Sequence, residues 1–358
     1  MIPKIISEDE EALEHFQFVT INGKLEVEEK GKLARPARDY RNTAKEGIRL
    51  AFQGVSISQA TKILQKTLPN YVYTETAYKN STAIVEAIKF HENGLRLHAE
   101  INKLWVASRG NKYDKGNRNI KLEVKDDYVE VRIKYPYDGS WIVGKAYFGK
   151  EYLPLLRELV SLTECREESY GVVITPSTIH VQVPIYLYLK FFSSKKVVGC
   201  GYVAGFDLNS DRLNLVVIND NKRILYKKTF WFTDVVSHGY PAERSREERL
   251  RAISEALDFA SSVGVDYVVF EDLFNIRRRR FGKSRSGNRR ISRFAKRDLL
   301  SHGVIKSLRM GFNVILVDAK GTTNSFLHKN VMQRFGLDRH MASAYLIALR
   351  GLKLIKSS

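Results

Sequence analysis

Three strand-like runs, joined by short polar turns, constrain the fold of this chain more than any other feature of its sequence. They cover residues 202–208, 213–218 and 223–232, and each is rich in β-branched and aromatic residues. The turns at 209–211 and 219–222 are polar and short enough to join neighbouring antiparallel strands. The pattern therefore predicts a three-stranded antiparallel meander.

Helices and strands alternate after the meander. The helix predicted over 244–262 is amphipathic, with Leu250, Ile253 and Leu257 on one face and Gly264 behind it. The other predicted elements, in chain order, are a strand over 267–270, a helix over 292–310, a strand over 313–317 and a helix that opens at Asp338. Three meander strands followed by helix, strand, helix, strand and helix is the element order of an RNase H-like fold.

The first 200 residues have a different texture. Residues 40–94 favour helices, one of them capped by Ser58, which precedes the apolar face formed by Ala60 and Leu64. Residues 120–135 predict a hairpin, and 179–191 alternate as one strand, in which Pro184 indicates an edge or a bulge. We expect a mixed α+β and α/β chain, with a β-rich domain over 1–200, a helical insertion at about 40–94, and a second domain over 201–358.

The charge of the chain indicates a polyanionic partner. Its formal net charge is +19 and its pI is about 9.7, and residues 201–358 hold 29 Lys and Arg against 15 Asp and Glu. A chain this basic usually binds nucleic acid. Its two cysteines exclude a disulfide framework and any zinc site that needs four cysteines. The sequence shows no signal peptide and no apolar run long enough for a membrane span, so we expect a cytoplasmic location and no membrane partner.

Three carboxylates fall at the points where an RNase H-like fold brings its elements together. Asp207 lies inside the first meander strand, Glu271 ends the short strand at 267–270, and Asp338 is the first residue of the final helix. Hard cations such as Mg²⁺ prefer such oxygen ligands, and two of them can drive in-line hydrolysis of a phosphodiester. We predict that Asp207, Glu271 and Asp338 are the catalytic and metal-binding residues, with Asp207 bridging two Mg²⁺ or Mn²⁺ ions.

Each acid also has an ordinary structural interpretation. Asp338 is a good helix N-cap, Glu271 and Asp272 are compatible with a plain strand-end pair, and Asp207 lies close to a turn. The metal prediction rests on the three occurring together at these positions. His340, two residues after Asp338, is a weaker candidate for assisting the site, because a lone histidine more often only hydrogen-bonds.

A strongly basic segment follows Glu271. Eleven of the 21 residues over 277–297 are Lys or Arg and none is acidic. We predict that its arginines contact nucleic acid: Arg277, Arg278, Arg279, Arg280, Arg285, Arg289, Arg290, Arg293 and Arg297. Each phosphate contact releases counterions, and Arg grips phosphate with two donors. The alternative is a solvated loop of like charges.

The sequence around the three acids resembles the RuvC motifs of the TnpB family. The segments are GFDLN at 205–209, VVFEDL at 268–273 and GLDRHMASAYLIALRG at 336–351, together with KGTTNS at 320–325. TnpB proteins are encoded by transposable elements and are relatives of type V CRISPR effectors. The resemblance covers 201–358. It implies a RuvC nuclease domain, an N-terminal β-barrel wedge domain with a helical recognition insertion, a guide RNA, and a double-stranded DNA target.

The chain departs from the family pattern at one place. TnpB proteins typically carry a four-cysteine zinc ribbon between the second and third motifs, but residues 322–338 contain no cysteine and only one histidine, His328. We therefore expect no zinc, and we expect a short loop in place of the ribbon. Two other functions remain open. They are a transposon-associated binding protein or repressor without cleavage, and an unguided RuvC-like nuclease that recognises DNA structure.

Overall fold

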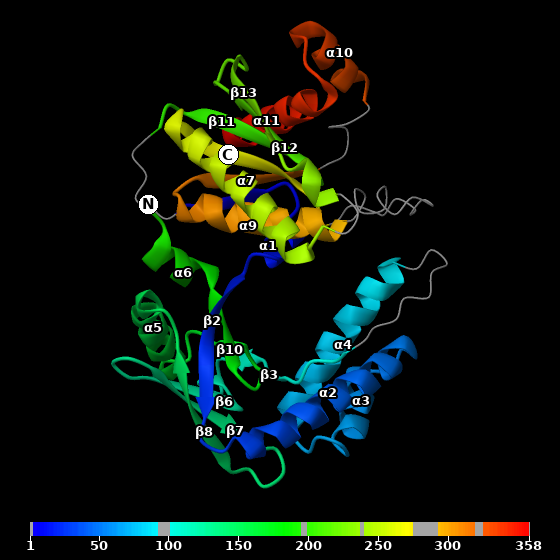
Figure 1. Ribbon diagram of the computed structural model, residues 1–358, viewed down its shortest axis with the longest axis vertical. Helices are drawn as coiled ribbons and strands as arrows, with labels where there is room; N and C mark the ends of the chain where they lie inside the picture. Colours follow the sequence, from blue (N-terminus) through cyan, green and yellow to red (C-terminus); the bar gives the residue numbers. More distant parts are fainter. Residues whose placement is uncertain are drawn as a thin grey trace. The chain divides into compact units, whose positions relative to one another are not determined.

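The protein divides into two compact units. The computed structural model describes residues 3–91, 101–194, 199–236, 240–274, 293–318 and 325–357. One unit is Phe18–Tyr188, and the other joins Met1–Gln17 to Leu189–Ser358 (Figure 1). The sequence pattern places the boundary at residue 200 and gives the whole N-terminal stretch to the first domain. In the structure, the strand β1 (Ile5–Ser7) pairs in parallel with β15 (Asn313–Asp318), so this stretch belongs with the C-terminal half.

The unit Phe18–Tyr188 is built on a curled, seven-stranded antiparallel sheet. Its strand order is β3-β9-β10-β2-β8-β7-β6. The strands are β2 (Phe18–Val27), β3 (Val106–Ser108), β6 (Ile120–Val124), β7 (Val129–Lys134), β8 (Trp141–Tyr147), β9 (Val172–Ile174) and β10 (Thr178–Pro184). The short pair β4 (Gly110–Asn111) and β5 (Gly116–Asn117) forms a separate two-stranded sheet. The predicted hairpin is present as β6 and β7, paired from Ile120↔Ile133 to Val124↔Val129.

Helices account for most of the remainder of this unit. They are α2 (Lys30–Phe52), α3 (Ile57–Leu64), α4 (Tyr71–His91) and α5 (Leu153–Glu164), with the 3-10 turn η1 (Lys150–Tyr152) before α5. Helical structure therefore begins ten residues before the expected start at 40. Ser56, not Ser58, caps α3, because its side chain accepts a hydrogen bond from the backbone N–H of Gln59.

The single strand expected over 179–191 is wrong in its second half. The strand β10 ends at Pro184, and α6 (Ile185–Phe192) follows at once. Along 185–192 every residue except Lys190 is apolar or aromatic, so alternation does not distinguish a strand from a short buried helix. Pro184 does not mark an edge strand either. The strand β10 lies between β9 and β2, and Pro184 occupies its last paired position, opposite Phe18.

The unit that holds the C-terminal half is built on a six-stranded mixed sheet of order β1-β15-β14-β11-β12-β13. The strands β11 (Tyr202–Leu208), β12 (Arg212–Ile218) and β13 (Ile224–Trp231) form the predicted antiparallel meander. The strand β14 (Val265–Asp272) pairs in parallel with β11 and with β15. The strand β11 therefore joins an antiparallel meander to a parallel set, which is the sheet arrangement that the element order predicts.

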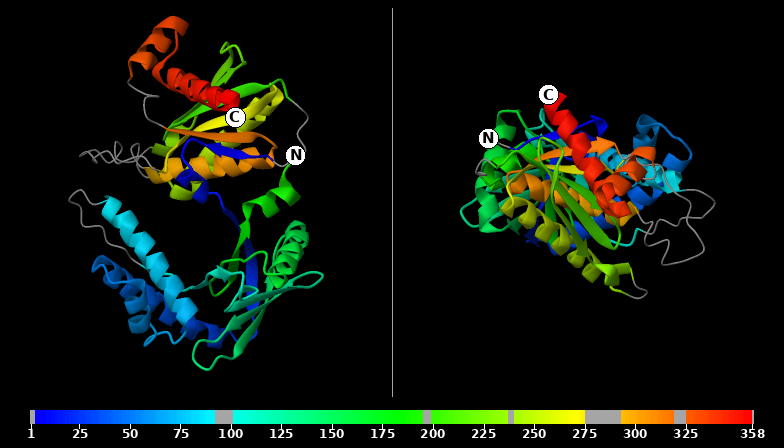
Figure 2. Two further views of the ribbon diagram at one scale, coloured as in Figure 1. Left: turned by 180° about the vertical axis from the view of Figure 1, so that it is seen from behind. Right: turned by 90° about the horizontal axis from the view of Figure 1, so that it is seen from above.

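Helices cover both faces of this sheet. On one face lie α7 (Ala242–Ser262) and α9 (Arg293–Arg309), and on the other lies α11 (Arg339–Ser357) (Figure 2). The remaining elements are α1 (Glu11–Glu14), the 3-10 turn η2 (Thr233–Val236) and α10 (Phe326–Phe335). No helix among the described residues has the length and apolarity that a membrane span requires.

The close approach of α11 to the sheet depends on small residues. Val203, Val269 and Ile315 of the sheet pack against Ala344 and other buried side chains of α11. At Gly205 of β11, a Cβ atom would lie 2.1 Å from the carbonyl oxygen of Ala344, so no larger residue fits without moving the helix. Since side chains alternate along a strand, Val203, Gly205 and Asp207 share the face that α11 covers.

Candidate functional site

Asp207 is a buried acid at the end of β11, on the face that α11 covers. The residue is only 5% exposed. Its Oδ2 accepts hydrogen bonds from Nδ2 of Asn209, at 2.7 Å, and from Nδ1 of His340, at 2.9 Å. Nδ1 of His340 donates to Asp207 in the tautomer that carries the proton on Nδ1, and the same atom lies 3.2 Å from Nδ2 of Asn209. The first turn of α11 thus contacts the acid directly.

Glu271 lies beside Asp207 in the sheet. The parallel pairing of β11 with β14 ends at Phe206↔Phe270, so Asp207 and Glu271 are each one residue further along neighbouring strands. Such strands run about 4.8 Å apart, and residues in register project to the same face. Val269, two residues before Glu271, packs beneath Gly351 of α11. Glu271 is half-buried and belongs to that same face.

Asp338 is the N-cap of α11. Its Oδ1 accepts hydrogen bonds from the backbone N–H groups of His340, at 2.8 Å, and Met341, at 2.9 Å. The capping role that the sequence suggests for Asp338 is therefore present. This cap also places Asp338 in the same helical turn as His340, whose ring contacts Asp207. A carboxylate that caps through one oxygen has a second oxygen for other chemistry.

The three predicted acids thus occupy one end of one face of the sheet. Their chemistry is that of a hard-cation site, with carboxylate oxygens from β11, β14 and the start of α11. Within the described ranges, however, no set of three His, Cys, Asp or Glu side chains is gathered closely enough to hold a metal ion. Metal binding by Asp207, Glu271 and Asp338 therefore remains a prediction.

Most of the predicted nucleic-acid contacts fall on residues 275–292, outside the described part of the chain, and the side chain of Arg293 is also outside it. Arg297 lies within the described residues, and its guanidinium is hydrogen-bonded to backbone carbonyls of the protein itself. Its guanidinium donates from Nε to the carbonyl of Leu273, at 3.3 Å, and from Nη2 to the carbonyl of Phe274. Burial lowers the pKa of Arg297, and the nearby Asp272 opposes that shift. Arg297 therefore fastens the chain after β14 to α9.

A helix, α10, occupies residues 326–335, where the sequence predicts a short loop. Ser325 caps α10 by accepting a hydrogen bond from the backbone N–H of His328, and Gly336 ends this helix in a left-handed conformation. His328 is buried, and its Nε2 lies 2.9 Å from the carbonyl oxygen of Arg339 and 3.2 Å from Oγ of Ser343. These contacts of His328, the one histidine of residues 322–338, join α10 to the start of α11.

Sequence reasoning also missed Asn214. It pairs directly opposite Asp207 in the antiparallel ladder of β11 and β12, and it is 2% exposed. Its Nδ2 donates to Oγ1 of Thr229 on β13, at 2.8 Å. A polar residue within the apolar run LNLVVI was the available signal, since Asn in a buried strand needs a partner.

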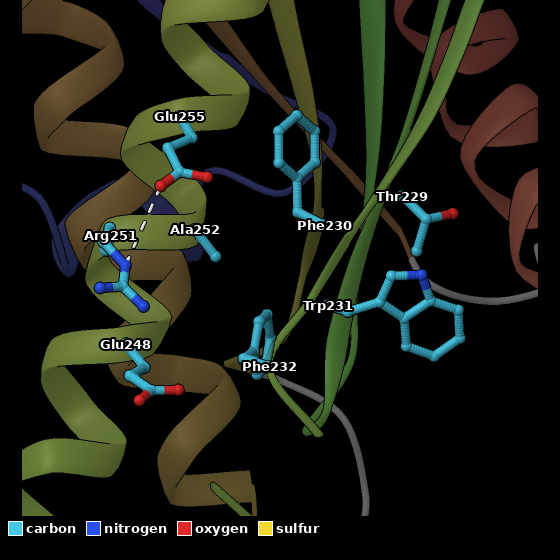
Figure 3. Close-up of a pocket in the computed structure, with 8 residues that line it drawn as sticks. All are labelled: Thr229, Phe230, Trp231, Phe232, Glu248, Arg251, Ala252 and Glu255. Carbon is cyan, nitrogen blue, oxygen red and sulfur yellow. Dashed lines mark ion pairs between the residues drawn. The ribbon is translucent and has the colours of Figure 1, made fainter. Parts of the chain in front are cut away.

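A pocket of about 370 Å³ lies between β13 and α7, on the opposite face of the sheet. Phe230 and Phe232 point toward α7, where Glu248 and the ion pair between Arg251 and Glu255 form the other wall (Figure 3). Thr229 and Trp231 contribute to its rim but point away from α7. The pocket is therefore separated by the sheet from Asp207.

Comparison with solved structures gives only weak likenesses. Thermus thermophilus RuvC in complex with a Holliday junction substrate matches 44% of this chain and 96% of its own, at 16% identity and a TM-score of 0.33. A Cas12f1–sgRNA–target DNA complex matches 88% of this chain and 81% of its own, at 11% identity and a TM-score of 0.43.

Relatives by sequence are much closer. An uncharacterized protein of Aeropyrum pernix is 28% identical over 314 residues, which is 83% of each chain. SSO2105 of Saccharolobus solfataricus, also uncharacterized, is 54% identical over 350 residues, covering 96% of this chain and 95% of that protein. The model of the SSO2105 N-terminal domain matches residues 18–193, nearly the same range as the unit Phe18–Tyr188. The chain therefore belongs to the SSO2105 family.

Proposed function

We propose that this protein is a nuclease that uses Mg²⁺ or Mn²⁺ to hydrolyse DNA, and that a guide RNA directs it to a double-stranded target as in TnpB proteins. The observation that supports this best is the placement of Asp207. It is an acid buried in the central strand of an RNase H-like sheet, beside Glu271 and within reach of the first turn of α11. Burying a carboxylate costs free energy unless something binds it.

The residue types present are the oxygen donors that the proposed metal ions prefer. Asp207, Glu271 and Asp338 would hold them, and the bound ions would activate water and stabilise the leaving oxygen. His340 and Asn209 both bond Oδ2 of Asp207 and so fix the direction of this carboxylate. Asp338 starts α11 and thereby sets the position of His340.

Guidance by RNA is supported by the motifs and by the charge. The segments around Asp207, Glu271 and Asp338 resemble the three RuvC motifs of a family that takes its target from RNA. The net charge of +19 suits a chain that holds two nucleic acids. The separate unit Phe18–Tyr188 provides a second folded body, which a simple junction-cutting nuclease does not need.

Metal binding can be tested without activity. Binding of Mg²⁺ to the folded state raises the thermal unfolding midpoint, so the wild-type midpoint should rise when EDTA is replaced by millimolar Mg²⁺. In Asp207→Asn the rise should vanish, because the variant keeps the side-chain shape and loses the charge. Asp266→Asn, which changes an acid remote from the proposed site, should keep the rise. An equal rise in Asp207→Asn would refute the metal assignment.

Guidance and cleavage need the protein with its own RNA. The full chain should be purified from its host, the RNA sequenced, and a plasmid matching that RNA incubated with the complex and Mg²⁺. A single RNA species and cleavage that Asp207→Ala abolishes would support the proposal. Cleavage without RNA would favour the unguided nuclease, and RNA-dependent binding without cleavage would favour the repressor.

A further inference from the structure

A row of polar side chains crosses the sheet from the proposed metal centre to its edge. Asp207 on β11 pairs with Asn214 on β12, which pairs with Thr229 on β13. Residues directly opposite in an antiparallel ladder share a face, so all three lie on the face of α11. Nδ2 of Asn214 donates to Oγ1 of Thr229, at 2.8 Å, so the Thr229 hydroxyl keeps its own proton for another acceptor.

Asn214 has unused bonding capacity. It is 2% exposed, and its Oδ1 is a buried oxygen that has no hydrogen-bond partner among the described residues. Buried polar atoms are nearly always satisfied in folded proteins. An unsatisfied oxygen in the row that starts at Asp207 suggests that this end of the face is completed by a ligand.

Trp231 lies two residues beyond Thr229 on the edge strand β13. It pairs with Arg212 of β12 and is 58% exposed. The Arg212 guanidinium lies 4.2 Å from the centre of its ring, and Asp211 holds Arg212 through hydrogen bonds of 3.2 and 3.0 Å. The indole is therefore fixed in place while most of its surface is open. Figure 3 shows Trp231 and Thr229 on the side of β13 that faces away from α7.

The edge strand thus presents three kinds of chemistry on one face. Lys227, Thr229 and Trp231 alternate along β13 and lie on the same face, about 6.8 Å apart. They offer a cation, a hydroxyl donor and an aromatic ring. A single nucleic-acid strand matches this set, with phosphate, polar base edge and base plane.

We propose that Trp231 is a base-stacking platform for an unpaired nucleotide of the DNA strand that is led to Asp207. Trp231 lies two strands across and two residues along from the row of Asp207, or about 12 Å between Cα atoms on strand spacings. Trp231 would therefore hold the DNA strand near the reacting phosphate, and the indole would not touch that phosphate. That this strand is the one led to Asp207 rests on the proposed function. Stacking of a base on Trp231 does not itself require cleavage.

A strand of another protein fits this edge less well. The edge strand carries two adjacent exposed lysines, Lys227 and Lys228, and charged residues of this kind discourage edge-to-edge pairing. The overall charge of +19 also favours a polyanion over a neutral partner. Single-stranded DNA suits Trp231 better than a duplex, because bases in a duplex already stack on one another.

The test is binding of a fluorescent oligothymidylate by the full chain, freed of RNA and kept in EDTA. High salt should be used, because it weakens phosphate contacts made elsewhere more than stacking. Trp231→Ala should weaken binding about 5- to 100-fold, and Trp231→Phe should retain most of it. The emission of Trp231, taken as wild type minus Trp231→Phe, should be quenched by the oligonucleotide.

Tyr226→Ala is the matched control. Tyr226 is 44% exposed on the same strand but faces α7, where it packs on Phe259, so its loss should leave binding within twofold. Unfolding midpoints of all variants should be compared to exclude misfolding. Unquenched Trp231 emission, equal losses for Trp231→Ala and Tyr226→Ala, or an equal loss of duplex binding would overturn the proposal. Because EDTA prevents cleavage, a failed nuclease assay would leave this result standing.

Discussion

At the scale of single residues, Gly205 sets how closely the helix that carries the candidate site approaches the sheet. A Cβ atom there would lie 2.1 Å from the Ala344 carbonyl oxygen and 2.5 Å from the Ala348 backbone nitrogen. Both neighbours are backbone, so α11 itself would have to move. Gly205→Ala should therefore lower the free energy of unfolding by about 1–3 kcal/mol or more, measured by urea denaturation.

Gly31 provides the control for this prediction. It lies in α2, and a Cβ atom added there would meet nothing within 4 Å. Gly31→Ala should leave stability unchanged or raise it by up to about 1 kcal/mol, since Ala favours the helix. If Gly205→Ala were as stable as Gly31→Ala, the packing of α11 on β11 would be looser than described.

His340 is a positioning residue for the proposed metal centre. Its Nδ1 bonds Oδ2 of Asp207, so its loss should leave the carboxylate less well directed. Removing such an outer partner usually costs about 10–100-fold in metal affinity or activity. His340→Ala should shift the Mg²⁺ concentration needed for half-maximal cleavage upward, while His340→Asn, which retains a donor, should recover part of the loss. An unchanged Mg²⁺ requirement in His340→Ala would contradict this role.

At the scale of elements, local pattern was sufficient where polar turns or a glycine bounded a segment. The meander, the helix before Gly264 and the helix before Gly311 are all found, because periodicity and positive-φ glycines are local signals. Fully apolar or short segments were harder. The run at 185–192 fits both the two-residue period of a strand and the 3.6-residue period of a helix. The strand β1 is defined only by its pairing with the distant β15.

The candidate site shows the same division. Its three acids could be chosen from the sequence, because the order of elements predicts which strand ends and helix starts lie together. Asn214 could not be chosen, since it meets Asp207 only through the register of β11 and β12. His340 was a weaker candidate in the sequence, and its contact with Asp207 depends on the docking of α11. Arg297 was assigned to nucleic acid on charge alone, but charge does not reveal that the carbonyls of Leu273 and Phe274 are its partners.

The helix α10 should stabilise the start of α11 through His328. Nε2 of this buried ring contacts the Arg339 carbonyl oxygen and Oγ of Ser343. His328→Ala removes both contacts and leaves a cavity, so unfolding free energy should fall by about 1–3 kcal/mol in urea denaturation. The neighbouring Lys329 is exposed, and Lys329→Ala should change stability by less than about 0.5 kcal/mol. Equal stability of both variants would mean that α10 is not anchored by His328.

At the scale of the whole molecule, the excess of positive charge strengthens nucleic-acid binding most through cations that contact phosphates. A net charge of +19 attracts any polyanion, but only cations that touch phosphates release counterions. Residues 277–280 are four consecutive arginines in the basic segment, outside the described residues. If they touch DNA, changing all four to Ser should reduce the slope of log affinity against log salt by about 3.

The control must lose the same charge elsewhere. Lys24, Lys62, Lys66 and Lys150 are exposed residues of the unit Phe18–Tyr188, and changing these four to Ser lowers the net charge equally. Binding of one DNA duplex should be measured over a series of salt concentrations for wild type and both variants. A contact role requires a smaller slope in the arginine variant and a nearly wild-type slope in the lysine variant. Equal slopes in all three proteins would place the segment 277–280 in solvent, as a run of like charges that touches no phosphate.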